Sequence, residues 1–515
     1  MKTIFLSASL LFISMTVHSQ FPDLNISNSP FWDTEPFLIS NPYNSSAVCA
    51  WMSTGQGLVT IKTKTSLYPG SVWGNTHTFP HHYLNATSAD VSMQYDGFGV
   101  LYLCFIDYKT TFDSGAVYFY KSPDDGITWD NGVKAFDLNE TADGAIDRPW
   151  FDMDHSATSN NIYLVTKSPE AVVVTNKHLW LKKSGDGGAT FSAPIQIDDT
   201  TYPAAGDKTM GTPCVDWQGN LFITYLSYEA GSFQYPKLVC AQSTDQGNSF
   251  TYSEITTFTS ANPDSTLQFD WAMKAAQSIP VVVYTSSNNG DMDIMSQRFV
   301  SNAWSAPIRL NTDPIGNGIQ QDMVWITKLN CLSFNGTEFM VAWRDRRNFG
   351  TAQSAPFEIY GVTSSDFGQT FYQDQKISVG SSPFQMLIKG NDFLGVTFNV
   401  DWIFAAWGDY RDGNWEIYIN RIPNPFYIHV PEISSDCEPV IKIFNQQLVI
   451  DNVCGFSNVV IQNVLGQTLV DQKIEQQEKP YQLWLRAPTT SGLYFITFSS
   501  EKNSLTQKFL IGNPE

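Results

Sequence analysis

Residues 121–129 read Lys-Ser-Pro-Asp-Asp-Gly-Ile-Thr-Trp, and this stretch decides how the rest of the chain is interpreted. Its skeleton is Ser-x-Asp-x-Gly-x-Thr followed by an aromatic residue. The skeleton, with Ser in place of Thr once, occurs four times, and its aspartates, separated by 62, 59 and 121 positions, are Asp124, Asp186, Asp245 and Asp366. The last gap is about two periods of the same repeat. A period of this length is typical of propellers and other repeat arrays.

The physical content of this motif is a tight turn. Its aspartate can accept backbone N–H bonds, its glycine permits a positive φ angle, and its aromatic residue is expected to fill space between neighbouring sheets. The motif resembles the Asp box of sialidase-like β-propellers, where it joins the third and fourth strands of a blade. In that family the box lies on the face away from the active site, so the resemblance implies a fold rather than an activity.

The repeat extends beyond the four complete motifs. Alignment on them gives seven copies of an apolar strand, a polar loop and an alternating strand, and an inner strand precedes most copies. The first copy has Tyr68 in place of the aspartate, and Trp304 alone remains of the fifth motif. Seven units of four strands predict an all-β, seven-bladed β-propeller over residues 30–430. Six blades, the number in sialidases, are the alternative.

Both ends of the chain predict export. Residues 1–19 combine Lys2, an apolar run and a Val17-x-Ser19 end, which is typical of a secretory signal peptide and too short to span a bilayer. No other stretch is apolar for long enough to be a transmembrane anchor. The protein is therefore expected to be secreted or attached to the cell surface.

Residues 435–515 form a separate β-rich module. It resembles the C-terminal sorting domain of the type IX secretion system of Bacteroidetes in Leu465-Gly-Gln467, Ser491-Gly-Leu-Tyr494 and Lys508-Phe509. The usual Tyr-Pro-Asn-Pro opening is missing, and residues 443–445 read Ile-Phe-Asn instead. The resemblance implies the type IX secretion machinery as a partner and says nothing about chemistry.

Composition narrows the remaining partners. The chain of 515 residues has a formal net charge of −20, which disfavours nucleic acid. Aromatic residues make up 14% and suit both a β-rich core and stacking on the sugars of an extracellular glycan. The seven cysteines include no Cys-x-x-Cys, so a zinc site is not expected, and no other motif predicts a metal or a cofactor. Cys437 and Cys454 bracket a hairpin-like segment and are candidates for a disulfide.

Propeller geometry selects the loops that can carry a site. The 4→1 and 2→3 connections share one face, whereas the 3→4 turns with the Asp boxes lie on the other. A site over the central axis is expected to use polar residues of the first set of loops. The candidates are Asp147, Arg148, Tyr228, Glu229, Arg344, Asp345, Arg346, Asp409 and Arg411.

The resemblance to sialidases implies roles for these residues. In that family three arginines hold the substrate carboxylate, a tyrosine assisted by a glutamate attacks the anomeric carbon, and an aspartate is the acid/base. The expected clamp is Arg148, Arg344 or Arg346, and Arg411, because guanidiniums present forked donors and stay charged. The expected acids are Asp147, Asp345 or Asp409, with Tyr228 and Glu229 as further catalytic candidates.

Three functions are compatible with these residues. The first is a secreted sialidase-like glycoside hydrolase. The second is a non-catalytic propeller that binds glycan or protein at the cell surface, because Trp-x-Asp-x-Arg in adjacent blades also suits Asp–Arg pairs that join neighbouring loops. The third is a uronate-directed polysaccharide lyase, for which His81 and His82 are candidates. The first two differ in whether the arginines converge on one axial pocket or each pair with a neighbouring aspartate.

Overall fold

The chain divides into two compact units. Unit 1 comprises Met1–Asn330 and Thr337–Asn424, and unit 2 comprises Cys331–Gly336 and Pro425–Glu515. The structure is a computed structural model and describes residues 21–511 except 45, 69–71, 155–160, 170–176, 205–208, 229–235, 259–269, 329–335, 353, 385–391, 400–401, 425–439, 445–446, 454–455, 464–465, 475–480, 487–491 and 501–503. The expected signal peptide, the expected Cys437–Cys454 disulfide and Glu229 lie outside these residues.

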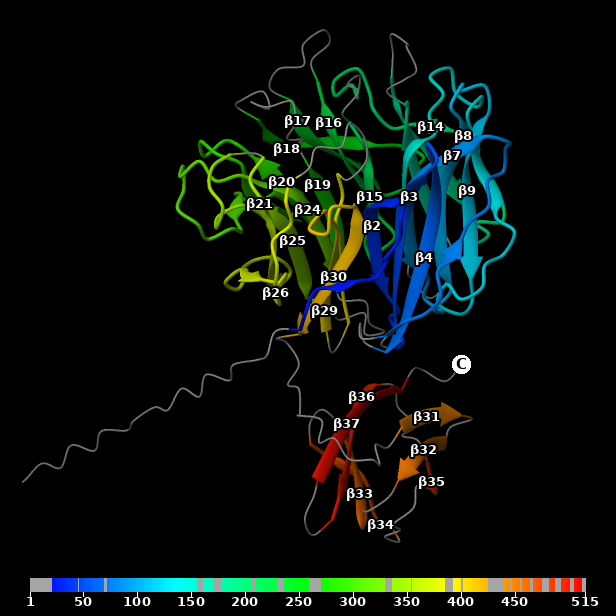
Figure 1. Cartoon of the computed structure of the whole chain (residues 1–515), viewed down its shortest axis with the longest axis vertical. Coiled ribbons are helices and arrows are strands. Elements are labelled where there is room, and N and C mark those ends of the chain that lie inside the picture. The colour runs from blue at the N-terminus through cyan, green and yellow to red at the C-terminus, as the bar shows by residue number, and fades with distance from the viewer. Residues whose placement is uncertain are drawn as a thin grey trace, which may run out of the picture. The chain divides into compact units, whose positions relative to one another are not determined.

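Within its described residues, unit 1 consists of seven antiparallel sheets (Figure 1). From the inner to the outer strand, the first is β2 (Trp32–Ser40), β3 (Ala47–Gly55), β4 (Leu58–Tyr68) and β5 (Val72–Trp73), with β6 (His77–Thr78) also on β4. The second is β7 (Ala86–Tyr95), β8 (Leu101–Lys109), β9 (Gly115–Ser122) and β10 (Val133–Asp137). The third is β11 (Asp147–Met153), β12 (Ile162–Lys167), β13 (Leu179–Ser184) and β14 (Ile195–Gln196). The fourth is β15 (Thr212–Val215), β16 (Leu221–Ser227), β17 (Lys237–Ser243) and β18 (Thr251–Thr257).

The fifth is β19 (Trp271–Ala276), β20 (Ile279–Ser286), β21 (Asp293–Val300) and β22 (Ala303–Trp304), with β23 (Ile308–Arg309) also on β21. The sixth is β24 (Gln321–Lys328), β25 (Phe339–Asp345), β26 (Glu358–Ser364) and β27 (Gln375–Lys376). The seventh is β28 (Gly395–Phe398), β29 (Trp402–Asp409), β30 (Glu416–Pro423) and β1 (Leu24–Asn25).

The inner strands form a closed ring. Each contacts the inner strand of the next sheet, in the order β2, β7, β11, β15, β19, β24 and β28, and β28 returns to β2. The all-β propeller class expected from the sequence is confirmed. Because every sheet has a neighbour on both faces, strands bury consecutive residues, and Leu101 to Ile106 of β8 are all buried.

The four motif turns use the same hydrogen bonds. In the third sheet, the Gly188 backbone N–H donates to Ser184 Oγ over 2.8 Å, and the Thr190 N–H and hydroxyl donate to the two carboxylate oxygens of Asp186 over 2.9 and 2.6 Å. These bonds hold the pKa of Asp186 below its ordinary value. These hydrogen bonds all lie within seven consecutive residues, so the motif determines its own geometry wherever it occurs.

Gly188 is the position of the motif that tolerates a side chain least. Its φ is +80°, and an added Cβ would lie 2.8 Å from Phe119 Cε1 of the neighbouring sheet. We expect Gly188→Ala to lower the free energy of unfolding by about 2–3 kcal/mol, from the left-handed backbone and the overpacking together. Gly185→Ala in the same turn is the control, since the nearest atom to its Cβ is 3.6 Å away. Urea unfolding of both variants measures the difference, and equal losses would contradict the assignment.

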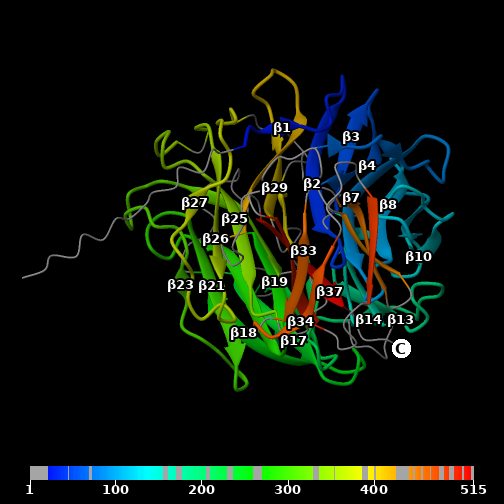
Figure 2. The ribbon, with the colours of Figure 1, turned by 90° about the horizontal axis from the view of Figure 1, so that it is seen from below.

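The seventh sheet joins the two ends of unit 1. Its outer strand β1 pairs with β30, with Leu24 opposite Ile419, and the two lie side by side in both views (Figures 1 and 2). Asp23 accepts hydrogen bonds from the backbone N–H groups of Val379 and Gly380, at 2.9 and 2.8 Å. The propeller therefore includes residues before 30, where the sequence placed its start.

Asp23 also binds two side chains of the seventh sheet. The Arg411 guanidinium donates to Asp23 over 2.8 Å, and the Asn420 amide donates over 2.7 Å. Four donors thus converge on one carboxylate beside β1. This explains why the seventh copy of the repeat has no motif turn, because its fourth strand comes from the N-terminal part of the chain.

Unit 2 contains two small antiparallel sheets. One is β31 (Val440–Phe444), β32 (Gln447–Val453) and β35 (Tyr481–Arg486), and the other is β34 (Thr468–Lys473), β33 (Asn458–Asn463), β36 (Gly492–Ser499) and β37 (Ser504–Ile511). Ile450 of the first sheet shares one buried apolar cluster with Ile461 and Phe498 of the second. Across the described ranges of the whole chain, no helix has the length and hydropathy needed to cross a lipid bilayer.

Candidate functional site

The candidate site lies at one end of the propeller axis. In the third sheet, Asp147 pairs with Lys167 at one end of the strands, whereas the motif residue Ser184 pairs with Ile162 at the other. The inner strands β2, β7, β11 and β24 each carry a bulge at the end away from the motif turns. The bulged residues have positive φ angles of 51°, 54°, 51° and 52° and are Glu35, Asp90, Arg148 and Met323.

A positive φ at a residue other than glycine is strained, and it recurs here at one structural position in four sheets. A β-bulge changes the direction in which the neighbouring side chains point. The recurrence of this strained backbone conformation therefore indicates that the bulges have a role. The side chains concerned gather around the axis, and they include Asp147 and Arg148 from the sequence-predicted set.

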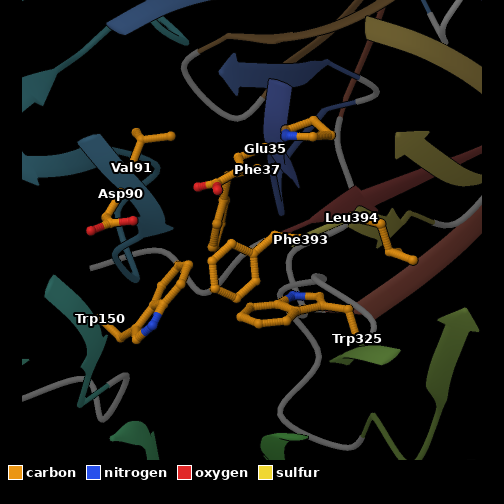
Figure 3. Close-up of a pocket in the computed structure, with 9 residues that line it drawn as sticks. Glu35, Phe37, Asp90, Val91, Trp150, Trp325, Phe393 and Leu394 are labelled. Atoms are coloured by element: carbon orange, nitrogen blue, oxygen red, sulfur yellow. The ribbon is translucent and has the colours of Figure 1, made fainter. Parts of the chain in front are cut away.

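Four aromatic side chains, three from inner strands and one from the segment before β28, lie close to Glu35 and Asp90 (Figure 3). Trp150 packs against Trp325 and Phe393, with ring centroids 5.4 and 5.1 Å apart, and Phe37 lies 5.9 Å from Trp150. Together with Glu35, Asp90 and neighbouring residues they line a pocket. Its free volume of about 10 Å³ is room for about one water molecule. A whole sugar ring does not fit inside.

Two pairs of carboxyl groups lie in hydrogen-bond contact around this pocket. Glu35 interacts with Asp392, and Asp90 interacts with Asp147. Two carboxyl groups can form such a bond only if one of them carries a proton, so each pair shares one. Burial, followed by the neighbouring carboxylate, raises the pKa of Asp90 to about 7 and that of Glu35 well above its ordinary value.

Their partners keep the negative charge because cations lie next to them. Arg148 donates to Asp392 over 2.6 Å and, against the effect of burial, lowers the pKa of Asp392 to about 2. Lys167 lies 2.8 Å from Asp147, whose pKa is also lowered. The Arg148 guanidinium lies over the Phe393 ring, 4.6 Å from its centroid, so it is held on two sides.

Arg344 and Arg346 are bound to a different carboxylate. Arg344 forms a two-pronged contact with Asp322, at 2.7 and 2.8 Å, and Arg346 donates to Asp322 over 3.1 Å. Asp322 and Arg346 are buried, and these guanidiniums lower the pKa of Asp322 in spite of burial. Asp270 accepts the Met323 backbone N–H over 2.8 Å. Its carboxyl group interacts electrostatically with both Asp322 and Asp392.

Protonation of Asp270 makes the stability of the fold depend on pH. Burial, reinforced by the charge of Asp322, raises the pKa of Asp270 to about 8. The folded protein therefore holds a proton that the unfolded chain releases near pH 4, and this group makes the protein less stable as the pH rises from about 4 to about 8. We expect Asp270→Asn to flatten that fall, so that the variant gains stability over the parent at pH 9 relative to pH 6.

Urea unfolding at pH 6, 7.5 and 9 checks this expectation. Asparagine can still accept the Met323 N–H, so folding is preserved. Asp113→Asn, at an exposed carboxyl on a loop of the second sheet, is the control. A parallel pH profile in parent and Asp270→Asn would show that Asp270 is not the group responsible.

The remaining arginine and aspartate candidates lie where the second strands of the sixth and seventh sheets end, with Asp345 and Asp409 as the last strand residues and Arg411 in the loop that follows. Asp409 accepts the Trp407 indole N–H over 2.7 Å and binds the Arg411 guanidinium over 2.6 Å, and Arg411 also holds Asp23. Asp345 repeats the pattern, accepting from Trp343 over 2.8 Å and from Arg347 over 2.6 Å. Each arginine also binds a second carboxylate from another segment, which is Asp23 for Arg411 and Asp374 for Arg347.

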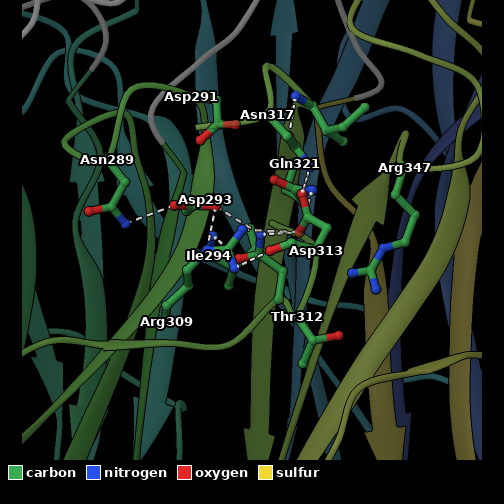
Figure 4. Close-up of polar contacts among 12 residues, drawn as sticks. Asn289, Asp291, Asp293, Ile294, Arg309, Thr312, Asp313, Asn317, Gln321 and Arg347 are labelled. Atoms are coloured by element: carbon green, nitrogen blue, oxygen red, sulfur yellow. Dashed lines mark hydrogen bonds and ion pairs between the residues drawn. The ribbon is translucent and has the colours of Figure 1, made fainter. Parts of the chain in front are cut away.

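The fifth sheet also places buried carboxylates beside a guanidinium and an amide donor, but with different residues (Figure 4). Asp293 binds the Arg309 guanidinium over 2.7 Å and the Asn311 amide over 2.8 Å, and Asp313 binds both as well. The recurrence of a buried carboxylate with a cationic or amide donor in three sheets indicates a structural role at this position.

Three further candidates remain, and they are Tyr228, His81 and His82. Tyr228 lies in the buried apolar cluster that also contains Trp150 and Phe393, and burial raises its pKa to about 12, so it is not prepared for nucleophilic attack. His81 Nδ1 lies 2.8 Å from Asp107, and the His82 ring stacks on Tyr118. Among the described residues, no group of three His, Cys, Asp or Glu side chains is arranged to hold a metal ion.

The structure therefore divides the predicted set. Asp147, Arg148, Arg344 and Arg346 lie near the axis, whereas Asp345, Asp409 and Arg411 do not join them. Tyr228 belongs to the apolar cluster of Trp150 and Phe393. Sequence reasoning missed Glu35, Asp90, Asp270 and Asp392. A usable signal existed for one of them, because Glu35-Pro36-Phe37 and Arg148-Pro149-Trp150 are the same charged-Pro-aromatic pattern in two sheets.

Comparison with known proteins covers both units. Residues 438–512 match the family described as secretion system C-terminal sorting domain. No curated protein matches the chain.

Solved structures similar to the chain include glycoside hydrolases. The endosialidase of phage phi92 is 10% identical, covers 96% of this chain and 80% of its own, and has a TM-score of 0.46. The alpha-L-arabinanase of Penicillium chrysogenum is 13% identical, covers 63% and 94%, and has a TM-score of 0.40. The NanB sialidase of Streptococcus pneumoniae is 13% identical, covers 79% and 70%, and has a TM-score of 0.37. Because the sequence identities are 13% or lower and the TM-scores are below 0.5, these structural similarities support no conclusion about activity.

Proposed function

We propose that this protein is an exported propeller that binds extracellular glycan at the axial end away from its Asp-box turns, without cleaving it. The single observation that carries this proposal is that each candidate guanidinium is already bound to a carboxylate of the protein. Arg148 is bound to Asp392, Arg344 and Arg346 to Asp322, and Arg411 to Asp409 and Asp23.

A sialidase-like clamp needs guanidiniums that are free to take up the substrate carboxylate. Releasing both Arg344 and Arg346 from Asp322 would leave a buried carboxylate without a cationic partner, at a cost of about 3–5 kcal/mol. The binding of one ligand carboxylate does not offset that cost. The geometry therefore supports binding over sialidase chemistry.

The lining of the axial pocket supports glycan as the ligand. Phe37 and Trp325 are partly exposed and offer apolar ring faces, whereas Trp150 and Phe393 are buried, and the carboxyl groups of the pocket offer hydrogen bonds. Sugars present the same combination of C–H faces and hydroxyl groups. Export through the type IX system, with removal of a signal peptide at residues 1–19, would place this site outside the cell and is supported by the sorting-domain match.

The proposal is tested by screening the purified protein for binding to an array of extracellular polysaccharides. Trp325→Ala is expected to weaken binding by about tenfold, which is the loss of about 1.4 kcal/mol of ring contact. Trp217→Ala is the matched control, because Trp217 is exposed at a loop between the first two strands of the fourth sheet. Equal binding by both variants, or no binding by the parent, would refute the proposal.

A glycoside hydrolase is the second candidate, and one specific observation favours it. A protonated carboxyl and an ionised one, here Asp90 and Asp392, are the pair that acid-catalysed glycoside cleavage requires. The same polysaccharides should therefore be assayed for release of new reducing ends. Turnover that disappears in Asp90→Asn while binding persists would establish the hydrolase and displace the binding function.

A further inference from the structure

The axial carboxyl groups fall into two classes according to their charge. Asp147, Asp322 and Asp392 are ionised, and each has a lysine or arginine in direct contact. The second class has raised pKa values and consists of Glu35, Asp90 and Asp270. They are the uncharged members of the cluster, and Glu35 and Asp90 share protons with ionised neighbours.

We infer that the axial pocket takes a single hydroxyl group of an uncharged sugar, bound by Glu35 and Asp90, and discriminates against sugars that carry a carboxylate. This inference rests on the proposed glycan-binding function and specifies its ligand class. Three features of the pocket lead to it.

The first feature is the chemistry of the lining. A protonated carboxyl both donates and accepts a hydrogen bond, and so does a hydroxyl group, which makes the two complementary. A carboxylate in the same place would have no hydrogen to donate, and since Lys167 and Arg148 neutralise Asp147 and Asp392, the discrimination rests on hydrogen bonding and size rather than on the charge of these two aspartates.

The second feature is size. The free volume of about 10 Å³ is matched by one water molecule or one hydroxyl group, and it excludes a carboxylate with its two oxygens. The third feature is the surrounding surface. Phe37 and Trp325 flank the pocket in Figure 3 and suit the apolar face of a sugar ring whose hydroxyl enters it. The net charge of −20 works against anionic glycans at long range.

The test measures binding of the full-length mature protein to two sets of hexasaccharides by calorimetry. One set is neutral, from arabinan, xylan and glucan, and the other is anionic, from polygalacturonate and polysialic acid. At least one neutral hexasaccharide is expected to bind at least about tenfold more tightly than every anionic one. Tighter binding of an anionic hexasaccharide overturns the inference and leaves the proposed function standing. Absence of binding to any glycan overturns both.

Variants at Asp90 separate a ligand contact from a merely structural role. An asparagine side chain would imitate the protonated acid, so Asp90→Asn is expected to bind within about threefold of the parent at pH 6, whereas Asp90→Leu loses at least about tenfold. Parent binding should weaken as the pH rises through about 7, and binding by Asp90→Asn should not. The groups that act on the Asp90 carboxyl are Glu35, Cys104, Tyr108, Asp147, Arg148 and Asp392.

The pH profile is the decisive readout because a folding defect would not remove it selectively. Asp113→Asn, at an exposed loop carboxyl of the second sheet, should keep both the affinity and the pH profile of the parent. Loss of binding in Asp90→Asn equal to that in Asp90→Leu, or an unchanged pH profile in Asp90→Asn, would overturn the inference.

Discussion

Replacement of Asp322 by alanine is expected to lower the free energy of unfolding by about 3–5 kcal/mol, the largest loss anticipated for one side chain of this propeller. Asp322 is buried and is the carboxylate that holds both Arg344 and Arg346, and Arg346 is itself 0% exposed. Without it the two guanidiniums lose the carboxylate that both of them contact in the interior. Urea unfolding at pH 7 measures the loss.

Asp374→Ala is the matched control for this prediction. Asp374 also binds a largely buried guanidinium, that of Arg347 at 2.6 Å, but Asp345 binds the same guanidinium at 2.6 Å and would continue to do so. The control should therefore lose only about 1–2 kcal/mol. If the two variants lose the same amount, the cost lies in the missing hydrogen bonds and not in the unpaired cations.

Replacement of Asp23 by alanine is expected to destabilise unit 1 by about 2–4 kcal/mol, because four donors lose their acceptor together. They are the backbone N–H groups of Val379 and Gly380, the Asn420 amide and one arm of Arg411. Hydrogen bonds to a charged group contribute about 1.5–3 kcal/mol each and do not add fully. In the variant Arg411 still contacts Asp409, so the loss of unfolding free energy is expected to be smaller than that caused by leaving a buried cation without a carboxylate.

Thermal unfolding and limited proteolysis check this second prediction. The variant should unfold at a lower temperature and be cut first within the seventh sheet, where β1 is attached. Asp113→Ala, which removes a carboxylate from an exposed loop of the second sheet, should match the parent in both assays. Cleavage that begins in another sheet would mean that Asp23 does not hold this strand in place.

The fold was predictable from the sequence because its signal is local. Every hydrogen bond of a motif turn joins residues within seven positions, so Ser184, Asp186 and Thr190 carry their geometry with them wherever they recur. The Trp-x-Asp-x-Arg repeat was also interpretable, since the pairing of Asp409 with Arg411 takes place within one loop.

The candidate site was only half predictable, because its contacts are not local. Glu35 and Asp392 come from opposite ends of unit 1 and meet only when the ring is closed. The residues around Asp90 do not identify it as part of a functional site, because it is a single acidic residue within a strand. What brings it to the axis is its bulge, with a φ of 54°, and a backbone conformation of that kind cannot be recognised from residue types alone.

The attachment of β1 to β30 also constrains the order in which the protein can fold. The contact between Asp23 and Arg411 spans 388 positions, so its two halves emerge at the beginning and near the end of synthesis. Contacts of such separation form slowly because a long loop must be closed before they are gained. Six sheets can assemble from consecutive segments, but the seventh waits for both ends. Completion of the ring is thus expected to be a late step of folding, and a chain that has not reached it would present an unpaired strand edge to its surroundings.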